Sequence, residues 1–217
     1  MKKKRDDALL TVAQVLPELR RLVDARPWLV MGKGPSFARL QELERHDYAG
    51  RVALNHVAAA TDCDIACMND LEVVGALGER LLDPGIVVLP DPPRVGCRDG
   101  NALSSYLQDY PALYDLAKLG GVATFRRVAR PQDGDVCARI SVAEVAFSLL
   151  SVMGVREIHI IGIDGGVGYA RGFDMSDHLR SGHASFDAQW PALREIVQHR
   201  NLTVREALTG ETPCWLC

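Results

Sequence analysis

Short apolar runs alternate with segments of helical periodicity along most of this chain, and that alternation limits the folds it can adopt. Seven runs have the length and composition of strands: residues 28–31, 51–55, 64–68, 86–89, 122–125, 157–163 and 202–204. Several are apolar on both faces, as strands of a parallel sheet covered by helices are. The pattern predicts an α/β fold with a Rossmann-like, doubly wound, mostly parallel sheet.

Two segments between or after the predicted strands have the pattern of helices. The clearest helix is predicted at residues 141–153, where Ser141 and Glu144 have capping-box spacing and Gly154 can end the helix. Another is predicted at residues 187–199.

The chain is expected to divide into an N-terminal segment and one domain. Pro17 is expected to split the N-terminal helical segment, residues 1–27, into two short helices. We expect residues 28–217 to form a single nucleotide-binding domain, in which residues 165–185 make a short lid-like loop before the last helix.

Composition restricts the partners. The chain has 217 residues, 47% of them hydrophobic and 24% charged, which suits one globular domain. A formal net charge of −3 gives no general attraction to nucleic acid. The basic residues 2–5 read as a solvated tail, with weak attraction to an anionic inner-membrane surface as the alternative. Without a signal-peptide pattern or a run of membrane-spanning length, a cytoplasmic protein is expected, and a homo-oligomer stays open.

The six cysteines are expected to be reduced thiols in that compartment. The spacings of Cys63 with Cys67 and of Cys214 with Cys217 would allow a Cys₄ zinc site. One pair falls in a predicted strand and the other at the terminus, so we predict no metal site.

A glycine-rich turn, Gly-Lys-Gly-Pro-Ser, follows the first predicted strand. Its two glycines let a ligand approach the backbone, and its proline and serine suit the first turn of a helix, where N–H groups and the helix dipole favour an anion. The spacing fits neither the dinucleotide-binding motif nor the P-loop. A phosphate-binding turn is predicted, with an empty strand–helix turn as the alternative. Its candidate residues are Gly32, Gly34, Pro35 and Ser36.

Small or hydrogen-bonding residues follow three other predicted strands. In doubly wound sheets ligands bind outside the carboxyl ends of the strands, so these residues are expected to meet in one crevice. The candidates are Asn55, Asn69, Asp70, Gly162, Asp164 and Gly165.

Three residues outside the strand ends add to this list. Ser141 begins the clearest helix, and Arg139 could present its guanidinium to a phosphate or carboxylate; a solvated arginine is the alternative. His183 in the lid-like loop could act as a general base near neutral pH, although a loop histidine can also be merely exposed.

These landmarks resemble, in order, those of the bacterial lipo-oligosaccharide sialyltransferases and, more loosely, of the 6-hydroxymethyl-dihydropterin diphosphokinase-like family. They are Gly32-x-Gly34-Pro35-Ser36, Asn55, Asn69-Asp70, Arg139-Ile140-Ser141, the segment from Gly154 to Asp164, and Gly182-His183. The resemblance covers roughly residues 28–200.

The resemblance implies roles. The turn and the two asparagines would bind a cytidine monophosphate donor, Arg139 and Ser141 would contact it, and His183 would deprotonate the acceptor without a metal. The sialyltransferases place two tyrosines on the leaving phosphate, and Tyr169 is the one candidate here. The chain also departs from their pattern at Val142, which stands where they carry a small hydroxyl residue.

The sequence therefore predicts a metal-independent glycosyltransferase that uses a nucleotide sugar as donor substrate, without a cofactor, and a bacterial surface glycan or its precursor as acceptor. Two alternatives remain. One is an ATP- and Mg²⁺-dependent pyrophosphoryl transferase acting on a pterin alcohol, with Asp70 and Asp164 as metal ligands. The other is a nucleotide-binding module without catalysis.

Overall fold

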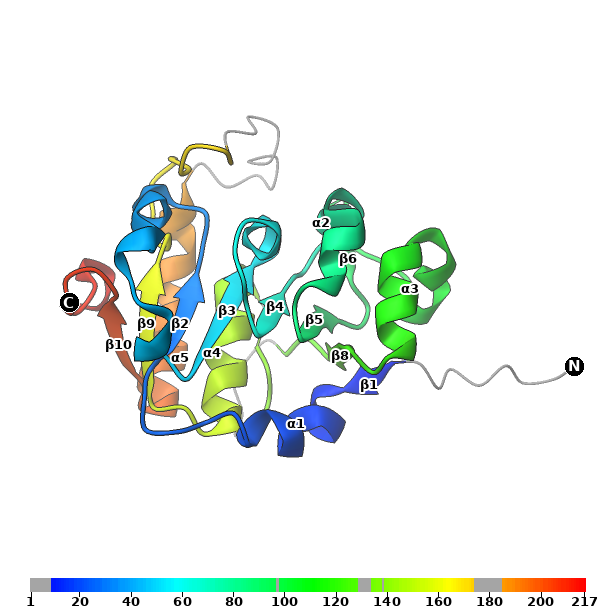
Figure 1. Cartoon of the computed structure of the whole chain (residues 1–217), viewed down its shortest axis with the longest axis horizontal. Helices are drawn as coiled ribbons and strands as arrows, with labels where there is room; N and C mark the ends of the chain where they lie inside the picture. Colours follow the sequence, from blue (N-terminus) through cyan, green and yellow to red (C-terminus); the bar gives the residue numbers. More distant parts are fainter. Residues whose placement is uncertain (1–8, 97, 129–133, 138, 174–184) are drawn as a thin grey trace, which may run out of the picture.

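The alternating pattern builds one parallel sheet (Figure 1). The structure is a computed structural model that describes residues 9–96, 98–128, 134–137, 139–173 and 185–217, and in this part of the chain eight strands form the sheet. Their order is β1-β8-β5-β4-β3-β2-β9-β10, and all neighbours are parallel. The strands are β1 (Leu10–Thr11), β2 (Trp28–Met31), β3 (Gly50–Leu54), β4 (Ile65–Cys67), β5 (Ile86–Pro90), β8 (Val122–Phe125), β9 (Glu157–Ile161) and β10 (Thr203–Glu206).

Helices cover both faces of this sheet. One apolar cluster joins α1, α4 and α5 to one face, and a second joins α2 and α3 to the other. The helices are α1 (Val12–Arg20), α2 (Leu71–Leu77), α3 (Pro111–Lys118), α4 (Val142–Met153) and α5 (Trp190–Arg200). Short 3-10 helices include η1 (Pro35–Glu42), η3 (Asn55–Ala59) and η8 (Phe186–Gln189), and a small antiparallel hairpin joins β6 (Arg94–Val95) to β7 (Arg98–Asp99). The predicted α/β class is confirmed.

Strand β2 shows why the predicted strands are apolar on both faces. Trp28 and Val30 belong to the cluster under α1, α4 and α5, whereas Leu29 and Met31 belong to the cluster under α2 and α3. All four side chains are fully buried. A strand whose successive side chains enter two cores reads as a continuous apolar run.

Helix α4 forms as its sequence predicts. Ser141 is its N-cap, and the Glu144 carboxylate accepts a hydrogen bond of 2.8 Å from the Ser141 N–H. Gly154 ends the helix with a left-handed φ of 106°, which glycine adopts without steric cost. Close to the other end of the chain, η8 and α5 together replace the single helix predicted at residues 187–199.

The N-terminal segment differs from the prediction. Pro17 lies inside α1 and does not split it, because Val12, Val15 and Leu19 are held in the core on both sides of the missing N–H. Just before α1, the two residues of β1 pair with β8 as the edge of the sheet. Residues 10–20 are therefore part of the main fold and not a segment that precedes it.

The chain reverses its direction of travel across the sheet at β2. From β2 it proceeds through β3, β4, β5 and β8, and it then returns to the other side of β2 to add β9 and β10. The loops that leave β2 and β9 lie at this switch point, which is where doubly wound sheets form their ligand crevice. In the described residues no helix is both long and apolar enough to cross a membrane.

Candidate active site

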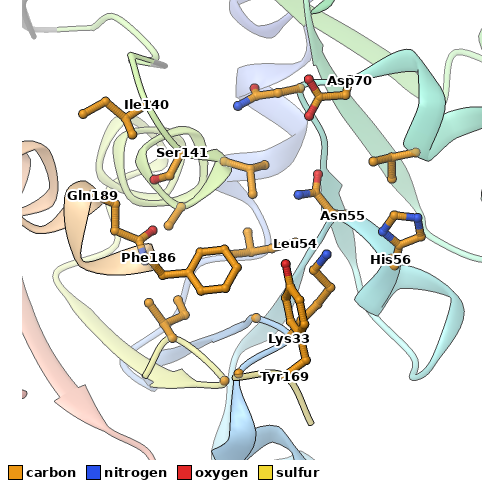
Figure 2. A pocket seen from close by; sticks show the side chains of 18 of the residues that line it. Lys33, Leu54, Asn55, His56, Asp70, Ile140, Ser141, Tyr169, Phe186 and Gln189 are labelled. Carbon is orange, nitrogen blue, oxygen red and sulfur yellow. The ribbon is translucent and has the colours of Figure 1, made fainter. Parts of the chain in front are cut away.

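A cleft of about 640 Å³ opens at the carboxyl ends of β2, β3, β4 and β9. It lies at the topological switch point between β2 and β9 (Figure 2). The predicted site residues that line it are Gly32, Gly34, Asn55, Asn69, Asp70, Ser141, Gly162, Asp164, Gly165 and Tyr169. Pro35, Ser36 and Arg139 do not line it. His183, the predicted base, lies outside the described residues, as do residues 174–184 of the lid-like loop and the basic residues 2–5.

The two glycines of the turn allow a close contact between two loops. A Cβ atom on Gly32 would overlap the carbonyl oxygen of Gly162, and one on Gly34 would lie 2.5 Å from Oδ2 of Asp164. The loops after β2 and β9 thus pack backbone against backbone. The contact between the two loops requires these glycines, and both of them also line the cleft.

Asp164 occupies the start of η1. Its Oδ2 accepts a hydrogen bond of 2.7 Å from the Ser36 N–H, and its Oδ1 accepts one of 2.5 Å from the Ser36 hydroxyl. The Gly34 N–H donates to the Gly162 carbonyl at 2.8 Å. The protein's own carboxylate and carbonyl therefore fill the helix-end anion site expected at Gly34 and Ser36. The helix that begins here is the 3-10 helix η1.

Lys33, between the two glycines, was not among the predicted site residues. Its half-buried side chain lines the cleft, and its Nζ lies 4.8 Å from the centroid of the Tyr169 ring. The Ala170 N–H donates to the Lys33 carbonyl at 2.8 Å, which holds Tyr169 beside it. Burial lowers the pKa of the Lys33 ammonium, and the charge of Asp70 opposes that shift. The sequence signal for Lys33 was its position within the turn.

Asn55 and Asn69, at the ends of β3 and β4, have side-chain oxygens without a hydrogen-bond donor in the described residues. Their Oδ1 atoms are buried, and neither accepts a hydrogen bond from a residue that the structure describes. Asn55 also adopts a left-handed φ of 54°, which is uncommon outside glycine. A buried acceptor without a donor costs about 1–3 kcal/mol. A ligand with hydroxyl or amino groups would remove that cost.

One end of the cleft is strongly charged. Asp70, Glu72 and Arg94 line it, and burial raises the pKa of the Asp70 carboxyl while the Arg94 charge opposes the shift. Arg94 was not predicted, since nothing in its local sequence marks it. Its N–H donates to the Asn69 carbonyl at 2.9 Å, and its Nη2 donates to the Arg139 carbonyl at 3.0 Å.

The Arg139 side chain is held by ion pairs and a hydrogen bond within the fold. Its guanidinium pairs with Glu144 at 3.1 Å and with Glu195 at 2.5 Å, and it also donates to the Ala192 carbonyl. The fully buried Glu144 carboxylate accepts from the backbone N–H groups of Arg139, Ile140 and Ser141 as well. The predicted contact of Arg139 with a ligand is replaced by an ion-pair network that holds residues 139–141 against α4 and α5.

The cysteines and carboxylates show no metal centre in the described residues. There, no group of three or more His, Cys, Asp or Glu side chains is placed to hold a metal ion. Burial raises the pKa of the Cys63 thiol to about 12 and raises that of Cys67 further, so both stay protonated. Both oxygens of Asp164, a metal ligand in the diphosphokinase alternative, are engaged by Ser36.

Comparisons with known proteins add little to this picture. No family model matches the chain, and no curated protein matches its sequence. Among solved structures, the sialyltransferase CstII from Campylobacter jejuni, in complex with the substrate analogue CMP-3FNeuAc, is similar with a TM-score of 0.49 and 11% sequence identity. The similarity covers 84% of this chain and 81% of that chain. What the cleft binds has to be inferred from its own side chains.

Proposed function

We propose that the protein is a glycosyltransferase that takes its sugar from a nucleotide donor. The observation that carries this proposal is the pair of buried, unpartnered Oδ1 atoms of Asn55 and Asn69 in the switch-point cleft. These acceptors need donors, and a sugar nucleotide offers several hydroxyl groups and, on cytosine, an amino group. The resemblance of the sequence landmarks to the sialyltransferases favours a cytidine monophosphate sugar within this class.

The cleft has suitable walls for such a donor. Phe186, Ile140 and Leu54 supply apolar surface at one side, and Asp70 supplies charge at the other (Figure 2). The charge of Arg94, which also lines the cleft, acts on Asp70. A planar base suits the apolar side, and a hydroxylated or charged sugar suits the polar one. Ser141, at the start of α4, lies between Ile140 and Phe186 in the view and is a further contact for the donor.

The reaction proposed is a displacement at the anomeric carbon. The bond from that carbon to the phosphate oxygen breaks, the electron pair stays on the phosphate, and the acceptor hydroxyl oxygen forms the new bond. His183 accepts the proton of that hydroxyl, as the sialyltransferase resemblance implies. No metal or cofactor takes part, and the acceptor is a bacterial surface glycan or its precursor.

A ligand screen followed by a turnover assay tests the proposal. Cytidine nucleotides are expected to raise Tm more than uridine, guanosine or adenosine nucleotides, because a ligand that binds only the native state stabilises it. Release of cytidine monophosphate from a donor sugar should persist in excess EDTA. Loss of turnover that Mg²⁺ restores would contradict metal independence, and binding of ATP with Mg²⁺ in place of cytidine nucleotides would contradict the donor class.

Replacement of His183 tests the proposed base separately. A general base contributes roughly 10²–10⁴-fold to the rate, so His183→Ala should lower kcat by about that factor and leave donor affinity nearly unchanged. His56, which lines the cleft, supplies the matched variant His56→Ala. Full activity in His183→Ala with loss of activity in His56→Ala would move the role of base to His56.

A further inference from the structure

Lys33 carries a positive charge into the cleft that the fold itself does not need. Among the described residues no carboxylate lies within ion-pair distance of its Nζ, and the contact that holds the side chain is the face of the Tyr169 ring. Figure 2 shows Lys33 and Tyr169 side by side, with Asn55 above them in that view. A desolvated ammonium in this position is costly unless an anion joins it.

Three backbone N–H groups of this turn already donate within the fold. The N–H groups of Gly32 and Gly34 donate to the carbonyls of Ile161 and Gly162, and the Ser36 N–H donates to Asp164. A phosphate at the carboxyl end of β2 would therefore depend on side chains. Lys33 lies at that end of the strand and points into the cleft.

Arg94, the other cation that lines the cleft in the described residues, is committed elsewhere. Its Nη2 donates to the Arg139 carbonyl, and its charge lies close enough to Asp70 to lower the pKa of that carboxyl. It also belongs to the charged wall that includes Glu72. Lys33 also feels the charge of Asp70. Its Nζ, however, lies over the neutral ring of Tyr169 and forms no ion pair with a described residue, so it is open to a monoanionic or dianionic phosphate.

We propose that Lys33 binds the phosphate of the nucleotide donor and neutralises it as it leaves. This inference rests on the proposed function. As the bond from the anomeric carbon to the phosphate oxygen breaks, negative charge grows on that oxygen, and the Lys33 ammonium donates a hydrogen bond to it without giving up its proton. A fixed cation in a partly desolvated site stabilises developing charge more strongly than one in water. Lys33 thus does here what a metal ion does in many nucleotide-sugar enzymes.

Binding measurements isolate the charge contact. Calorimetry should show that Lys33→Met weakens binding of cytidine monophosphate by roughly 10- to 100-fold, the usual loss of a charge-assisted hydrogen bond. Binding of cytidine, which has no phosphate, should be unchanged. Lys33→Arg should retain much of the preference for the monophosphate. Lys118→Met is the matched control, because Lys118 also lies over a tyrosine ring, 3.9 Å from the centroid of Tyr114, but on α3 away from the cleft.

The catalytic role has its own measurement. Loss of one preorganised donor to developing charge lowers kcat by roughly 10²–10³-fold, and Lys33→Met should show that loss while Lys118→Met shows none. The chain holds few lysines, namely Lys33, Lys118 and three within residues 1–4, so ¹³C-methylated lysine signals can be assigned by these variants. Addition of cytidine monophosphate should raise the pKa reported by the Lys33 signal and leave that of Lys118 in place.

The outcomes separate the two proposals. Wild-type protein that prefers cytidine monophosphate over cytidine, with the preference kept in Lys33→Met, would overturn the role of Lys33 and leave the glycosyltransferase proposal standing. Wild-type protein that binds cytidine and its monophosphate equally would also overturn it. Wild-type protein that binds no nucleotide and releases none from a donor sugar would overturn both.

Discussion

At the scale of single residues, the cleft contains side chains whose surroundings make the empty protein less stable. The buried acceptor atoms without donors and the half-buried carboxyl of Asp70, whose pKa is raised, are of this kind. The same groups are those that a ligand could satisfy. Substitutions here are therefore expected to separate stability from binding.

Asn69 offers the clearest case. Asn69→Leu replaces a 4% exposed amide, whose Oδ1 has no donor, with an apolar side chain of similar shape. Without added ligand, Tm of this variant should equal or exceed that of the parent, because the penalty of the unpaired acceptor disappears. The gain in the free energy of unfolding should be about 1 kcal/mol at most. The rise in Tm caused by nucleotide should be lost. Asn101→Leu, at an exposed position outside the cleft, is the control, and a fall in Tm confined to Asn69→Leu would show that its amide is satisfied within the fold.

Asp70 should give a dependence on pH with a definite sign. Burial raises the pKa of this carboxyl in the folded state above its ordinary value of 3.8, so the ionised form weakens the fold at neutral pH. Asp70→Asn should therefore raise the free energy of unfolding at pH 7. The gain should shrink as pH falls through the raised pKa and vanish below about 3.8, where the parent is neutral in both states. Urea titrations of both proteins between pH 7 and pH 3 measure this, and a gain that grows toward acid pH would refute it.

At the scale of elements, the wall of the cleft formed by residues 139–141 is held by one buried carboxylate. Glu144, which is fully buried, accepts from three backbone N–H groups and pairs with Arg139. Glu195 pairs with the same guanidinium but is 47% exposed. The two glutamates thus share a partner and differ in burial.

That contrast predicts that substitution of the two glutamates lowers the free energy of unfolding by different amounts. Glu144→Gln puts an NH₂ group among donors that need an acceptor and should lower the free energy of unfolding by about 3–5 kcal/mol, as the loss of one member of a buried pair does. Glu195→Gln should cost about 1 kcal/mol or less, since solvent screens that pair. Urea unfolding measures both. Equal costs would mean that the hydrogen bonds to Glu144 contribute no more than the exposed pair.

At the scale of the whole molecule, the N-terminal segment shares the main core. Leu19 on α1 is 5% exposed and packs in the cluster under the sheet, whereas Leu22, just beyond the helix, is 47% exposed. Leu19→Ala should lower the free energy of unfolding by about 2–5 kcal/mol, the usual range for a buried leucine. Leu22→Ala should change it by about 0.5 kcal/mol or less. Two separate thermal transitions in the parent would instead indicate that the segment folds apart from the sheet.

The sequence by itself determined the class of fold and the region of the site. Apolar runs that enter two cores, the capping box at Ser141 and the glycine after α4 are local signals, and local signals survive in the folded chain because each element keeps its own periodicity. The rule that ligands bind at the carboxyl ends of strands then placed Asn55, Asn69 and Asp164 along one cleft. Edge strand β1 was missed because two residues carry no periodicity.

Only the tertiary structure decided what each polar group in that region is free to do. Ser36 and Asp164 stand 128 residues apart in the chain, and their contact uses the Ser36 N–H that the turn was expected to offer to phosphate. Arg139 and Glu195 are 56 residues apart, and their pairing removes the arginine from the cleft. Hydrogen-bonding capacity is filled by whichever partner the fold brings within about 3 Å. For that reason Lys33, which stands between two glycines in the sequence, is the cation of the cleft for which we propose a phosphate.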